Sequence, residues 1–495
     1  MPKLFPSALE PRPGQLQALE NIQNAFKDGK KFFVLEGPTG FGKSALAKAV
    51  LNFCGKGFIT SPLNTLVRQY SQDNDLGLTE VRGQSTYTCR AFDGLNCEKA
   101  SDSFDDHSSK CIDYVVARDA FWTAKHSVTN VHFLSYASPI EGAVYPRDVL
   151  VIDEAHNLEN ILTAMVGRTI TPEDVKAIDA RLFDFPGDDK ELLNLKKVID
   201  WLKYFESAIT HALADISDGE EKRKYESLRQ GINFTLNCGD WITWKENNKL
   251  IISPMSAKQT VKSLFRCASR VLFMSATMGD IPLFLNNLGI NQKDAVVYRA
   301  TCEFPPENRR IIYRNRGSMS KAWNQPGLPQ MLQECSLILR NRPDERGIIH
   351  CHSRDLQQIV SQHLLKEFGK RILTHGTGAD RDGGIKRLKD SRNGVLCSVA
   401  MTEGLDLRDD EARFCIFAKI PWPNLSDPYI AERRKRSQDW YENLTVLSII
   451  QGSGRVVRSL TDHADTFIFD SSFERLMPRF PAWWKSAIVT SSHVF

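Results

Sequence analysis

The chain has 495 residues, of which 42% are hydrophobic and 25% charged, a globular balance that supplies enough apolar residues for several cores. Its formal net charge of +4 is only mildly basic, so the overall charge does not establish binding to nucleic acid. No charged start precedes a long apolar run, and no window approaches 18 consecutive apolar residues. We therefore expect neither a signal peptide nor a membrane span.

Short apolar strands alternate with helical patterns along most of the chain, which predicts an α/β fold with parallel sheets. The expected strands are 32–35, 58–60, 149–152, 271–274, 348–350, 395–398, 414–417 and 466–469. The expected helices include 43–53 and 63–70. Two stretches interrupt the alternation. Residues from about 72 to 139 contain clustered cysteines and few strand signals, and residues from about 157 to 249 are mostly helical and amphipathic.

The simplest plan is one α/β domain that carries both interrupting stretches as insertions, followed by a second α/β domain. No internal repeat, low-complexity run or long charge block points to another organisation. The expected boundaries are 1–71, 140–156 and 250–298 for the first domain, 72–139 for the Cys-bearing insertion, 157–249 for the helical insertion and 299–495 for the second domain.

A glycine-rich loop ending in Lys43 and Ser44 follows the strand FFVLE and opens the helix SALAKAVLNF. Glycines let the backbone wrap around phosphate, and a helix N-terminus favours an anion. Lys43 is expected to reach the β- and γ-phosphates of ATP and Ser44 to bind Mg²⁺. This strand–turn–helix context disfavours a glycine turn without a ligand. The loop residues expected to contact the nucleotide are Gly37, Pro38, Thr39, Gly40, Phe41 and Gly42.

The 11 cysteines are not expected to form a disulfide framework, because the chain is large and no signal peptide is expected. Most sit singly in apolar runs and are expected to be small buried residues; they include Cys267, Cys351, Cys397 and Cys415. Cys89, Cys97 and Cys111 differ, because they cluster in a polar, loop-like stretch.

Two acidic residues, Asp153 and Glu154, directly follow the strand DVLVI. Ligands bind at strand ends in open α/β sheets. Asp153 is expected to hold Mg²⁺, and Glu154 to orient and deprotonate the attacking water. Alone, such a pair is as readily a solvated helix start. Behind the glycine-rich loop the catalytic interpretation is favoured.

Two further strand ends carry short polar motifs. Ser275 and Thr277 follow the strand VLFM, where their hydroxyl groups can relay the state of the nucleotide through hydrogen bonds. Glu403 and Asp406 follow VLCSVAM and are candidate nucleotide-site residues. A plain strand-end turn or loop is the alternative for both motifs.

The segment from Gln451 to Arg458 carries two arginines, Arg455 and Arg458, three positions apart on one expected helix face. Guanidinium groups stabilise the charge on a transferring γ-phosphoryl group. Gly452 and Gly454 are expected to open a turn from a loop into a helix. The alternative is a surface salt-bridge face.

In this order, the motifs resemble those of the XPD/DinG family of superfamily 2 helicases. The matching segments are RPGQ, GPTGFGKS, ITSPLNTLVRQ, VIDEAHN, MSATM, TEGLDL, QGSGRVVRS and AKIPWPNLSDP. The resemblance implies two RecA-like parallel-sheet motor domains with ATP between them, and 5′→3′ translocation on single-stranded DNA. It also implies an iron–sulfur insertion, a helical Arch insertion and an adenine-side motif that holds Arg12 and Gln15. Gln451 belongs to the segment that resembles the family's motif VI.

The family's iron–sulfur cluster has four cysteine ligands, whereas only Cys89, Cys97 and Cys111 lie in the matching stretch. Cys54 ends the helix after the glycine-rich loop and is a poor fourth ligand. His107 is the best local substitute, although its surroundings read as a solvated loop. A [4Fe–4S] cluster, a Cys₃His zinc site, a degenerate metal-free site and purely structural thiols all remain open.

The expected partners are single-stranded DNA and forked or tailed duplex DNA, with repair, replication or phage and host proteins as further candidates. Candidate contacts are Ser61, Asn64, His352, Ser353 and Arg381. The alternatives are a translocase that remodels protein–DNA complexes or R-loops without processive unwinding, and a non-catalytic module that holds ATP. A monomer in the cytoplasm is expected, near the nucleoid or in a virus-infected cell, and a nuclear protein only in a eukaryote.

Overall fold

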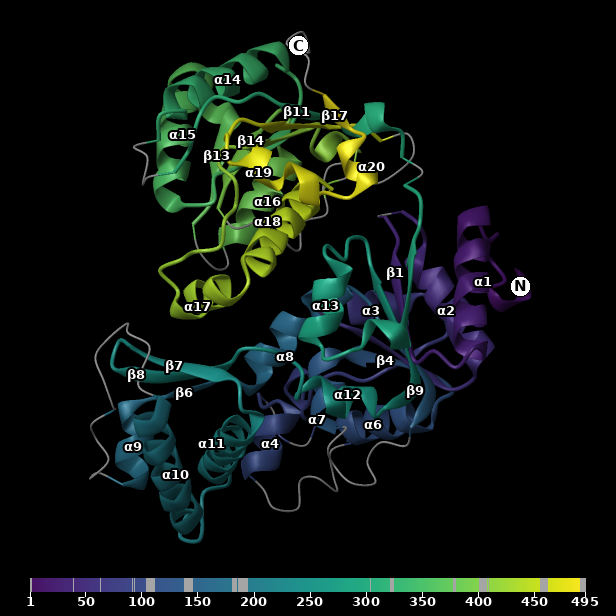
Figure 1. The fold of residues 1–495 in the computed structure, drawn as a ribbon, viewed down its shortest axis with the longest axis vertical. Helices are drawn as coiled ribbons and strands as arrows, with labels where there is room; N and C mark the ends of the chain where they lie inside the picture. The colour runs from purple at the N-terminus through teal and green to yellow at the C-terminus, as the bar shows by residue number, and fades with distance from the viewer. Residues whose placement is uncertain are drawn as a thin grey trace. The chain divides into compact units, whose positions relative to one another are not determined.

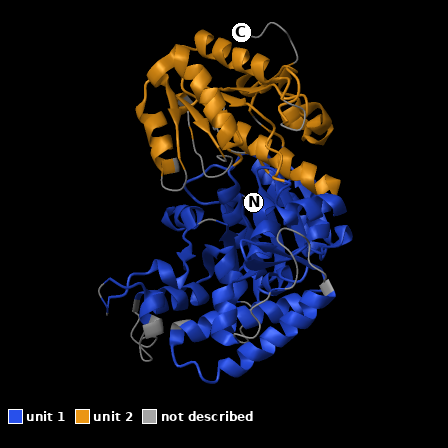
Figure 2. Ribbon diagram, turned by 90° about the vertical axis from the view of Figure 1, so that its left-hand side faces the viewer, with its two compact units in different colours: residues 1–36, 42–300, 425–436 blue, residues 37–41, 301–424, 437–495 orange. Residues whose placement is uncertain are grey.

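The structure is a computed structural model, and its chain divides into two compact units (Figure 2). Unit 1 comprises residues 1–36, 42–300 and 425–436, and unit 2 comprises residues 37–41, 301–424 and 437–495. The structure describes residues 2–489 except 39, 63, 91, 93, 104–111, 138–145, 180–184, 186–194, 303, 321–324, 377–379, 400–406, 408 and 455–461.

Unit 1 is built on a sheet of seven parallel strands in the order β10-β1-β9-β5-β2-β4-β3 (Figure 1). The strands are β1 (Phe32–Glu36), β2 (Gly57–Ser61), β3 (Thr79–Glu80), β4 (His126–Asn130), β5 (Arg147–Ile152), β9 (Ala268–Ser275) and β10 (Ala295–Arg299). Every residue of β1, β2 and β4 is buried, as expected for a parallel sheet with both faces covered. The associated helices are α1 (Pro13–Lys27), α2 (Lys43–Cys54), α3 (Asn64–Gln72), α6 (Ile112–Thr123), α7 (Val131–Ala137), α8 (Leu158–Val166), α12 (Val261–Phe265) and α13 (Ile281–Asn287).

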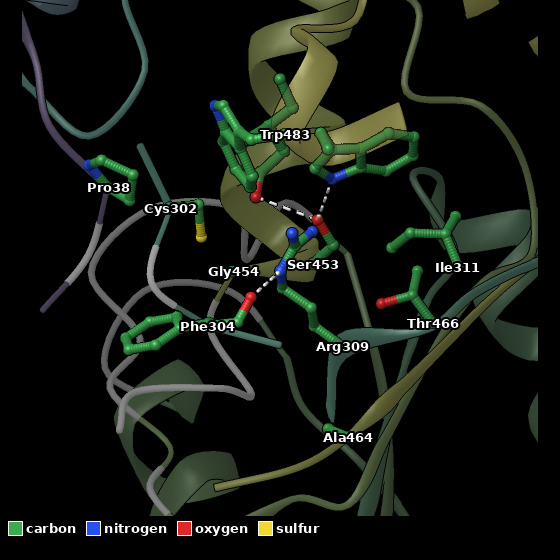
Figure 3. A pocket seen from close by; sticks show the side chains of 12 residues that line it. Pro38, Cys302, Phe304, Arg309, Ile311, Ser453, Gly454, Ala464, Thr466 and Trp483 are labelled. Atoms are coloured by element: carbon green, nitrogen blue, oxygen red, sulfur yellow. Dashed lines mark hydrogen bonds between the residues drawn. The ribbon is translucent and has the colours of Figure 1, made fainter. Parts of the chain in front are cut away.

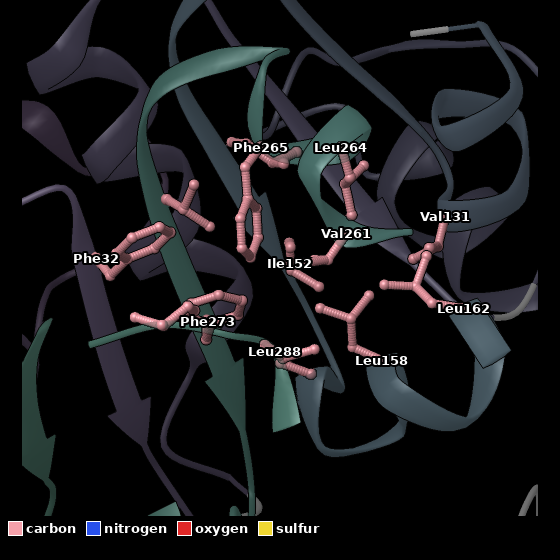
Figure 4. Packing of buried hydrophobic residues seen from close by; sticks show 14 of the residues in the cluster. Phe32, Val131, Ile152, Leu158, Leu162, Val261, Leu264, Phe265, Phe273 and Leu288 are labelled. Atoms are coloured by element: carbon pink, nitrogen blue, oxygen red, sulfur yellow. The ribbon is translucent and has the colours of Figure 1, made fainter. Parts of the chain in front are cut away.

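A core of aromatic and aliphatic side chains fixes the central strands of this sheet (Figure 4). The rings of Phe32 on β1 and Phe273 on β9 stack with centroids 6.1 Å apart, and Phe265 packs on Phe32 at 5.0 Å. Ile152 on β5 and Leu158 on α8 join the same cluster. Burial of these side chains therefore holds β1, β5 and β9 in register, and the functional motifs follow these three strands.

All eight expected strands are present, several of them longer than expected, and helices α2 and α3 occupy the expected positions. Two strands, β3 and β4, fall where few strand signals were found. Strand β4 lies within the range 72–139, yet it pairs with β2 along its whole length, His126 opposite Gly57 and Asn130 opposite Ser61. The end of this range is therefore part of the sheet of unit 1.

The helical insertion contains helices and a small antiparallel sheet in the order β6-β8-β7. Its elements are β6 (Arg168–Ile170), α9 (Pro172–Ile178), α10 (Leu195–Ala212), α11 (Gly219–Cys238), β7 (Trp241–Glu246) and β8 (Lys249–Pro254). The β7–β8 turn consists of Asn247 and Asn248, whose φ angles of 49° and 58° suit a tight hairpin. Trp241 and Trp244 are both 6% exposed and therefore belong to the core rather than to the surface.

A segment expected in the second domain instead groups with unit 1. The chain leaves unit 2 after Asn424, contributes residues 425–436 to unit 1 and returns to unit 2 at Ser437. Helix α17 (Pro428–Arg436) forms most of this segment.

Unit 2 contains a second sheet of seven parallel strands, in the order β13-β14-β12-β15-β16-β11-β17. The strands are β11 (Ile311–Tyr313), β12 (Gly347–His350), β13 (Ile372–Thr374), β14 (Val395–Ser398), β15 (Phe414–Phe417), β16 (Asp465–Ile468) and β17 (Ile488–Val489). The helices are α14 (Leu328–Asn341), α15 (Arg354–Phe368), α16 (Asp380–Asp390), α18 (Gln438–Ser453), α19 (Phe473–Leu476) and α20 (Ala482–Lys485). Cys351, Cys397 and Cys415 are fully buried here, and Cys267 is fully buried in unit 1, as expected. Within the described residues, no helix combines the length and the apolar character needed to cross a bilayer.

Candidate functional site

Three neighbouring parallel strands bring the motifs of unit 1 to one edge of the sheet. Strand β9 lies between β1 and β5, and Glu36 at the end of β1 pairs with Ser275 at the end of β9. Asp153 follows the last residue of β5. Because parallel strands end at the same edge, the glycine-rich loop, the acidic pair and the serine motif lie together.

The glycine-rich loop has the backbone that its sequence predicts. Gly40 and Gly42 have φ angles of 79° and 80°, in the left-handed region that favours glycine. Helix α2 begins at Lys43, directly after Gly42, so the loop ends on a helix N-terminus. Thr39 lies outside the described residues. This arrangement suits phosphate, because the first backbone N–H groups of the helix have no partner within it.

Gln15 connects helix α1 to this loop. Its Nε2 donates to the carbonyl oxygen of Gly42 at 3.2 Å, and its Oε1 accepts from the backbone N–H of Arg12 at 2.8 Å. A Cβ on Gly42 would lie 2.3 Å from that Nε2, so a side chain here would displace Gln15. Gln15 is buried, and its amide therefore supports the phosphate loop from behind.

Asp153 is held by two donors. Tyr70 on α3 donates its hydroxyl to Oδ2 at 2.9 Å, and the backbone N–H of Glu154 donates to Oδ1 at 3.0 Å. Burial, and to a smaller extent the negative charge of Glu154, raises the pKa of Asp153 to about 6, against the opposing effect of Lys43. Burial also raises the pKa of the Tyr70 phenol well above its ordinary value, so the phenol remains a donor at neutral pH.

Glu154 is part of a hydrogen-bonded chain that sequence reasoning found only in part. The Ser275 hydroxyl donates to Glu154 Oε2 at 3.3 Å, and His156 Nδ1 lies 2.8 Å from the same hydroxyl oxygen. Glu154 has a φ of 48°, a strained value for a residue with a side chain. His156 stands two residues after Glu154 in the acidic motif but was given no role of its own.

The residues at this edge fit a nucleotide bound with Mg²⁺. Ser44 and Asp153 supply the oxygen atoms that Mg²⁺ prefers, and Lys43 supplies a positive charge at the start of the helix. Tyr70 is the functional residue most clearly missed, because an aromatic residue on a helix signals core packing.

In unit 2, Gln451 lies in the last turn of α18, and the expectation that Gly452 and Gly454 open a turn from a loop into a helix is wrong. Gly452 is inside this helix and Gly454 caps its C-terminus. The glycine at position 452 serves close packing, since a Cβ there would lie 2.7 Å from the ring of Phe417. Arg455 and Arg458 lie outside the described residues.

The end of α18 is anchored beside a small pocket of unit 2 (Figure 3). The Trp484 indole N–H donates to the Ser453 hydroxyl at 3.0 Å, and Arg309 donates to the carbonyl oxygen of Phe304 at 3.2 Å. The pocket is lined by Pro38, Cys302, Phe304, Arg309, Ile311, Ile450, Ser453, Gly454, Ala464, Thr466, Trp483 and Trp484. Trp484 therefore fixes the helix that leads into Arg455, and no local sequence signal pointed to it.

The structure brings two of the candidate cluster ligands together. Cys89 and Cys97 are 3% and 1% exposed, and their backbone N–H groups donate to the carbonyl oxygens of Leu95 and Tyr87 beside an isolated antiparallel bridge. Cys111 and His107 lie outside the described residues. Within the described part of the chain, no three His, Cys, Asp or Glu side chains gather as a metal site. Burial raises the pKa of Cys54 to about 12, which agrees with its rejection as a ligand.

The candidate DNA contacts differ in accessibility. Ser61 is fully buried, whereas Asn64 is exposed and accepts a hydrogen bond from Asn130 at 2.7 Å. His352 lies 2.7 Å from the carbonyl oxygen of Trp422, and Ser353 caps helix α15. The side chain of Arg381 and the residues Glu403 and Asp406 lie outside the described structure.

Two family models match separate parts of the chain. The helicase C-terminal domain matches residues 336–487, and the res subunit of type III restriction enzymes matches residues 8–164. The sequence is 22% identical to the ATP-dependent DNA helicase YoaA of Escherichia coli, over 50% of this chain and 40% of that protein. It is 22% identical to the regulator of telomere elongation helicase 1 homolog of Caenorhabditis elegans, over 60% of this chain and 35% of that protein.

The chain thus matches only about two fifths or less of the length of these relatives. Among solved structures, the fold is similar to that of S. tokodaii Xpd4, with a TM-score of 0.65 and 16% identity over 97% of this chain and 100% of that chain. A structure titled XPD_Helicase gives a TM-score of 0.65 and 15% identity over 98% and 100%. The two parallel-sheet folds, the two matched models and these relatives together support the resemblance of the chain to the XPD/DinG-like superfamily 2 helicases.

Proposed function

We propose that this protein is an ATP-driven DNA helicase that moves along single-stranded DNA in the 5′→3′ direction and separates duplex DNA. The observation that carries the proposal is the shared strand edge in unit 1, where the N-terminus of helix α2, Asp153, Glu154 and Ser275 lie together. A non-catalytic nucleotide holder needs the phosphate loop alone. It does not need a carboxylate pair in which Glu154 is strained and hydrogen-bonded to Ser275.

Each residue at this edge has a defined task in hydrolysis. The N-terminus of α2 and Lys43 would bind the β- and γ-phosphates, and Ser44 and Asp153 would hold Mg²⁺, which would supply positive charge to the phosphate oxygens. Glu154 orients the attacking water and accepts its proton. Ser275 orients the Glu154 carboxylate through its hydroxyl.

The remaining steps of the motor are inferred from the resemblance. Arg455 and Arg458 would stabilise negative charge on the transferring phosphoryl group, and Gln451 would contribute from the last turn of α18. Binding without sequence preference would come from contacts to the DNA backbone along strand ends, with Asn64 the accessible candidate in unit 1. Tailed and forked duplexes are the proposed substrates.

The Cys-bearing insertion is proposed to hold a [4Fe–4S] cluster through Cys89, Cys97 and Cys111. Two of these thiols are buried side chains of one small hydrophobic cluster, together with Ala100. Zinc remains the alternative metal, because its usual sites also combine cysteine with histidine. No step of hydrolysis depends on this metal.

A single substitution tests the proposal. Lys43→Ala is expected to abolish DNA-stimulated ATP hydrolysis, whereas Lys56→Ala, an exposed lysine just beyond the same helix, should leave it unchanged. Strand displacement on duplexes with a 5′ or a 3′ tail then measures unwinding and polarity. Hydrolysis retained by Lys43→Ala would refute the assignment of the site. Hydrolysis without strand displacement by the natural protein would replace the helicase with a translocase.

A further inference from the structure

Tyr70 is a buried tyrosine on helix α3 whose hydroxyl contacts Asp153 of the candidate nucleotide site. It lies near the C-terminal end of α3 and is 4% exposed. Its hydroxyl donates to Asp153 Oδ2 at 2.9 Å across 83 positions of sequence. A phenylalanine would fill this space equally well, so the hydroxyl contributes something beyond packing.

The hydroxyl determines how the Asp153 carboxylate is oriented. One carboxylate oxygen accepts from Tyr70 and the other from the backbone N–H of Glu154, so both ends of the group are fixed. A carboxylate has about four acceptor positions, so each oxygen keeps capacity for the water shell of a metal ion. Tyr70 thus fixes the carboxylate without using up its capacity to bind.

The same phenol is also influenced by the phosphate-loop helix. The Ser44 side chain opposes the rise in the pKa of the Tyr70 phenol. Ser44 and Asp153 are the two residues proposed to hold Mg²⁺, so the Tyr70 hydroxyl bonds to one of them and is influenced by the other. They come from different parts of the chain, Ser44 from the start of α2 and Asp153 from the end of β5.

We propose that Tyr70 is a positioning residue for Mg²⁺–nucleotide binding, which holds the Asp153 carboxylate and the Ser44 hydroxyl in the arrangement that the metal ion requires. The inference rests on the proposed nucleotide site. It assigns no step of bond breaking to Tyr70. Groups that orient metal ligands typically change metal affinity by about 10–100-fold when they are removed.

The test is Tyr70→Phe, which removes the hydroxyl and keeps the ring. Binding of a fluorescent ATP analogue is measured while Mg²⁺ is titrated, and steady-state hydrolysis is measured over the same Mg²⁺ series. The Mg²⁺ concentration that gives half of the full response should rise about ten-fold or more in both assays. Binding without Mg²⁺ and the hydrolysis rate at saturating Mg²⁺ should stay within about two-fold.

The matched control is Tyr313→Phe in unit 2, where the lost hydroxyl donates to Glu474 at 2.9 Å. Thermal denaturation of both variants verifies that each remains folded. An unchanged Mg²⁺ dependence in Tyr70→Phe overturns the inference and leaves the proposed motor intact. If the natural protein binds the ATP analogue but does not hydrolyse ATP, the proposal of an ATP-driven motor is refuted. A shifted Mg²⁺ dependence of binding in Tyr70→Phe would still support the positioning role of Tyr70. If the rate of ATP hydrolysis by Tyr70→Phe stays low at saturating Mg²⁺, Tyr70 acts at another step, and this result also overturns the inference.

Discussion

Arg433 and Glu159 are separated by 274 positions in sequence, and their side chains form a buried ion pair with Nη2 and Oε1 2.7 Å apart. Arg433 also donates to the carbonyl oxygen of Met255 at 2.7 Å, and Glu159 also accepts from Asn287 at 2.9 Å. The pair attaches helix α17 to unit 1 between two stretches of unit 2. A buried pair of this kind fixes the position of a segment more than it adds net stability.

Arg433→Ala should release this segment. Removing one partner of a buried pair costs about 3–5 kcal/mol, because the other charge is left with fewer partners. We expect the amide hydrogens of residues 428–436 to exchange faster by a factor of about 100 or more, measured by hydrogen-exchange mass spectrometry.

Arg436→Ala on the same helix is the control. Its partner Asp240 is exposed, and a surface ion pair contributes about 0–1 kcal/mol. Equal exchange in the two variants would mean that the buried pair does not hold the helix.

The parts of the site that could be predicted from the sequence are motifs whose residues lie close together along the chain. A glycine loop between a strand and a helix, and an acidic pair directly after a strand, need only local chain geometry. The structure has both, because β1, β5 and α2 form where apolar periodicity indicates. Burial of Cys267 and of the two tryptophans of β7 follows from the same periodicity.

The parts that were not predictable depend on contacts between distant positions. Tyr70 reads as a core residue until Asp153 is found beside it. Gly452 was expected to begin a turn, but it lies inside helix α18, where the ring of Phe417 occupies the space that a side chain would need. The apolar pattern did not indicate strand β4, because its polar sequence, HSVTN, is buried only by its pairing in the sheet.

Ser275→Ala should separate hydrolysis from movement. The change removes the hydroxyl between His156 and Glu154, while those two side chains remain 3.4 Å apart. We expect ATP turnover to fall by less than about five-fold, since loss of one hydrogen bond corresponds to about 1 kcal/mol. Strand displacement should fall further, by about ten-fold or more, if the hydroxyl relays the state of the nucleotide to movement. Both rates are measured on one tailed duplex.

Ser263→Ala on α12 controls for loss of a serine hydroxyl, because that group bonds only locally, to the carbonyl oxygen of Thr260 at 2.8 Å. It should leave both rates unchanged. If Ser275→Ala lowers turnover and strand displacement by the same factor, the hydroxyl acts on hydrolysis alone and the relay is wrong.

His126 should make the stability of unit 1 sensitive to acid. Burial, followed by the charge of Lys48, lowers the pKa of His126 from 6.5 to about 4. Lys48 Nζ lies 2.9 Å from Nδ1, and Nε2 lies 2.8 Å from the carbonyl oxygen of Gly55, so the folded protein holds the neutral ring. Below pH 6.5 the His126 ring becomes protonated in the unfolded chain but stays neutral in the folded chain until the pH approaches about 4. The free energy of unfolding therefore falls as the pH drops from about 6.5 to about 4.

His126→Gln removes this titration and keeps an amide that can replace both hydrogen bonds. Urea denaturation at several pH values should show that the difference between the natural protein and the variant changes below pH 6.5 and is constant above it. His211→Gln on the exposed side of α10 is the control and should give a constant difference throughout. A constant difference for His126→Gln as well would exclude the residue as a source of acid sensitivity.

The Cys-bearing insertion gives a test that is independent of hydrolysis. Protein purified without oxygen should be brown, with broad absorbance near about 400 nm and bound iron, as expected for iron ligated by thiolates. Cys89→Ser and Cys97→Ser should each remove the colour and the iron, because both thiols are buried in the cluster region.

The control variant Cys238→Ser should retain both the colour and the iron, since that half-buried thiol belongs to the helical insertion. Colourless natural protein with one zinc per chain would assign the site to zinc, and protein without bound metal would leave the three cysteines a structural role.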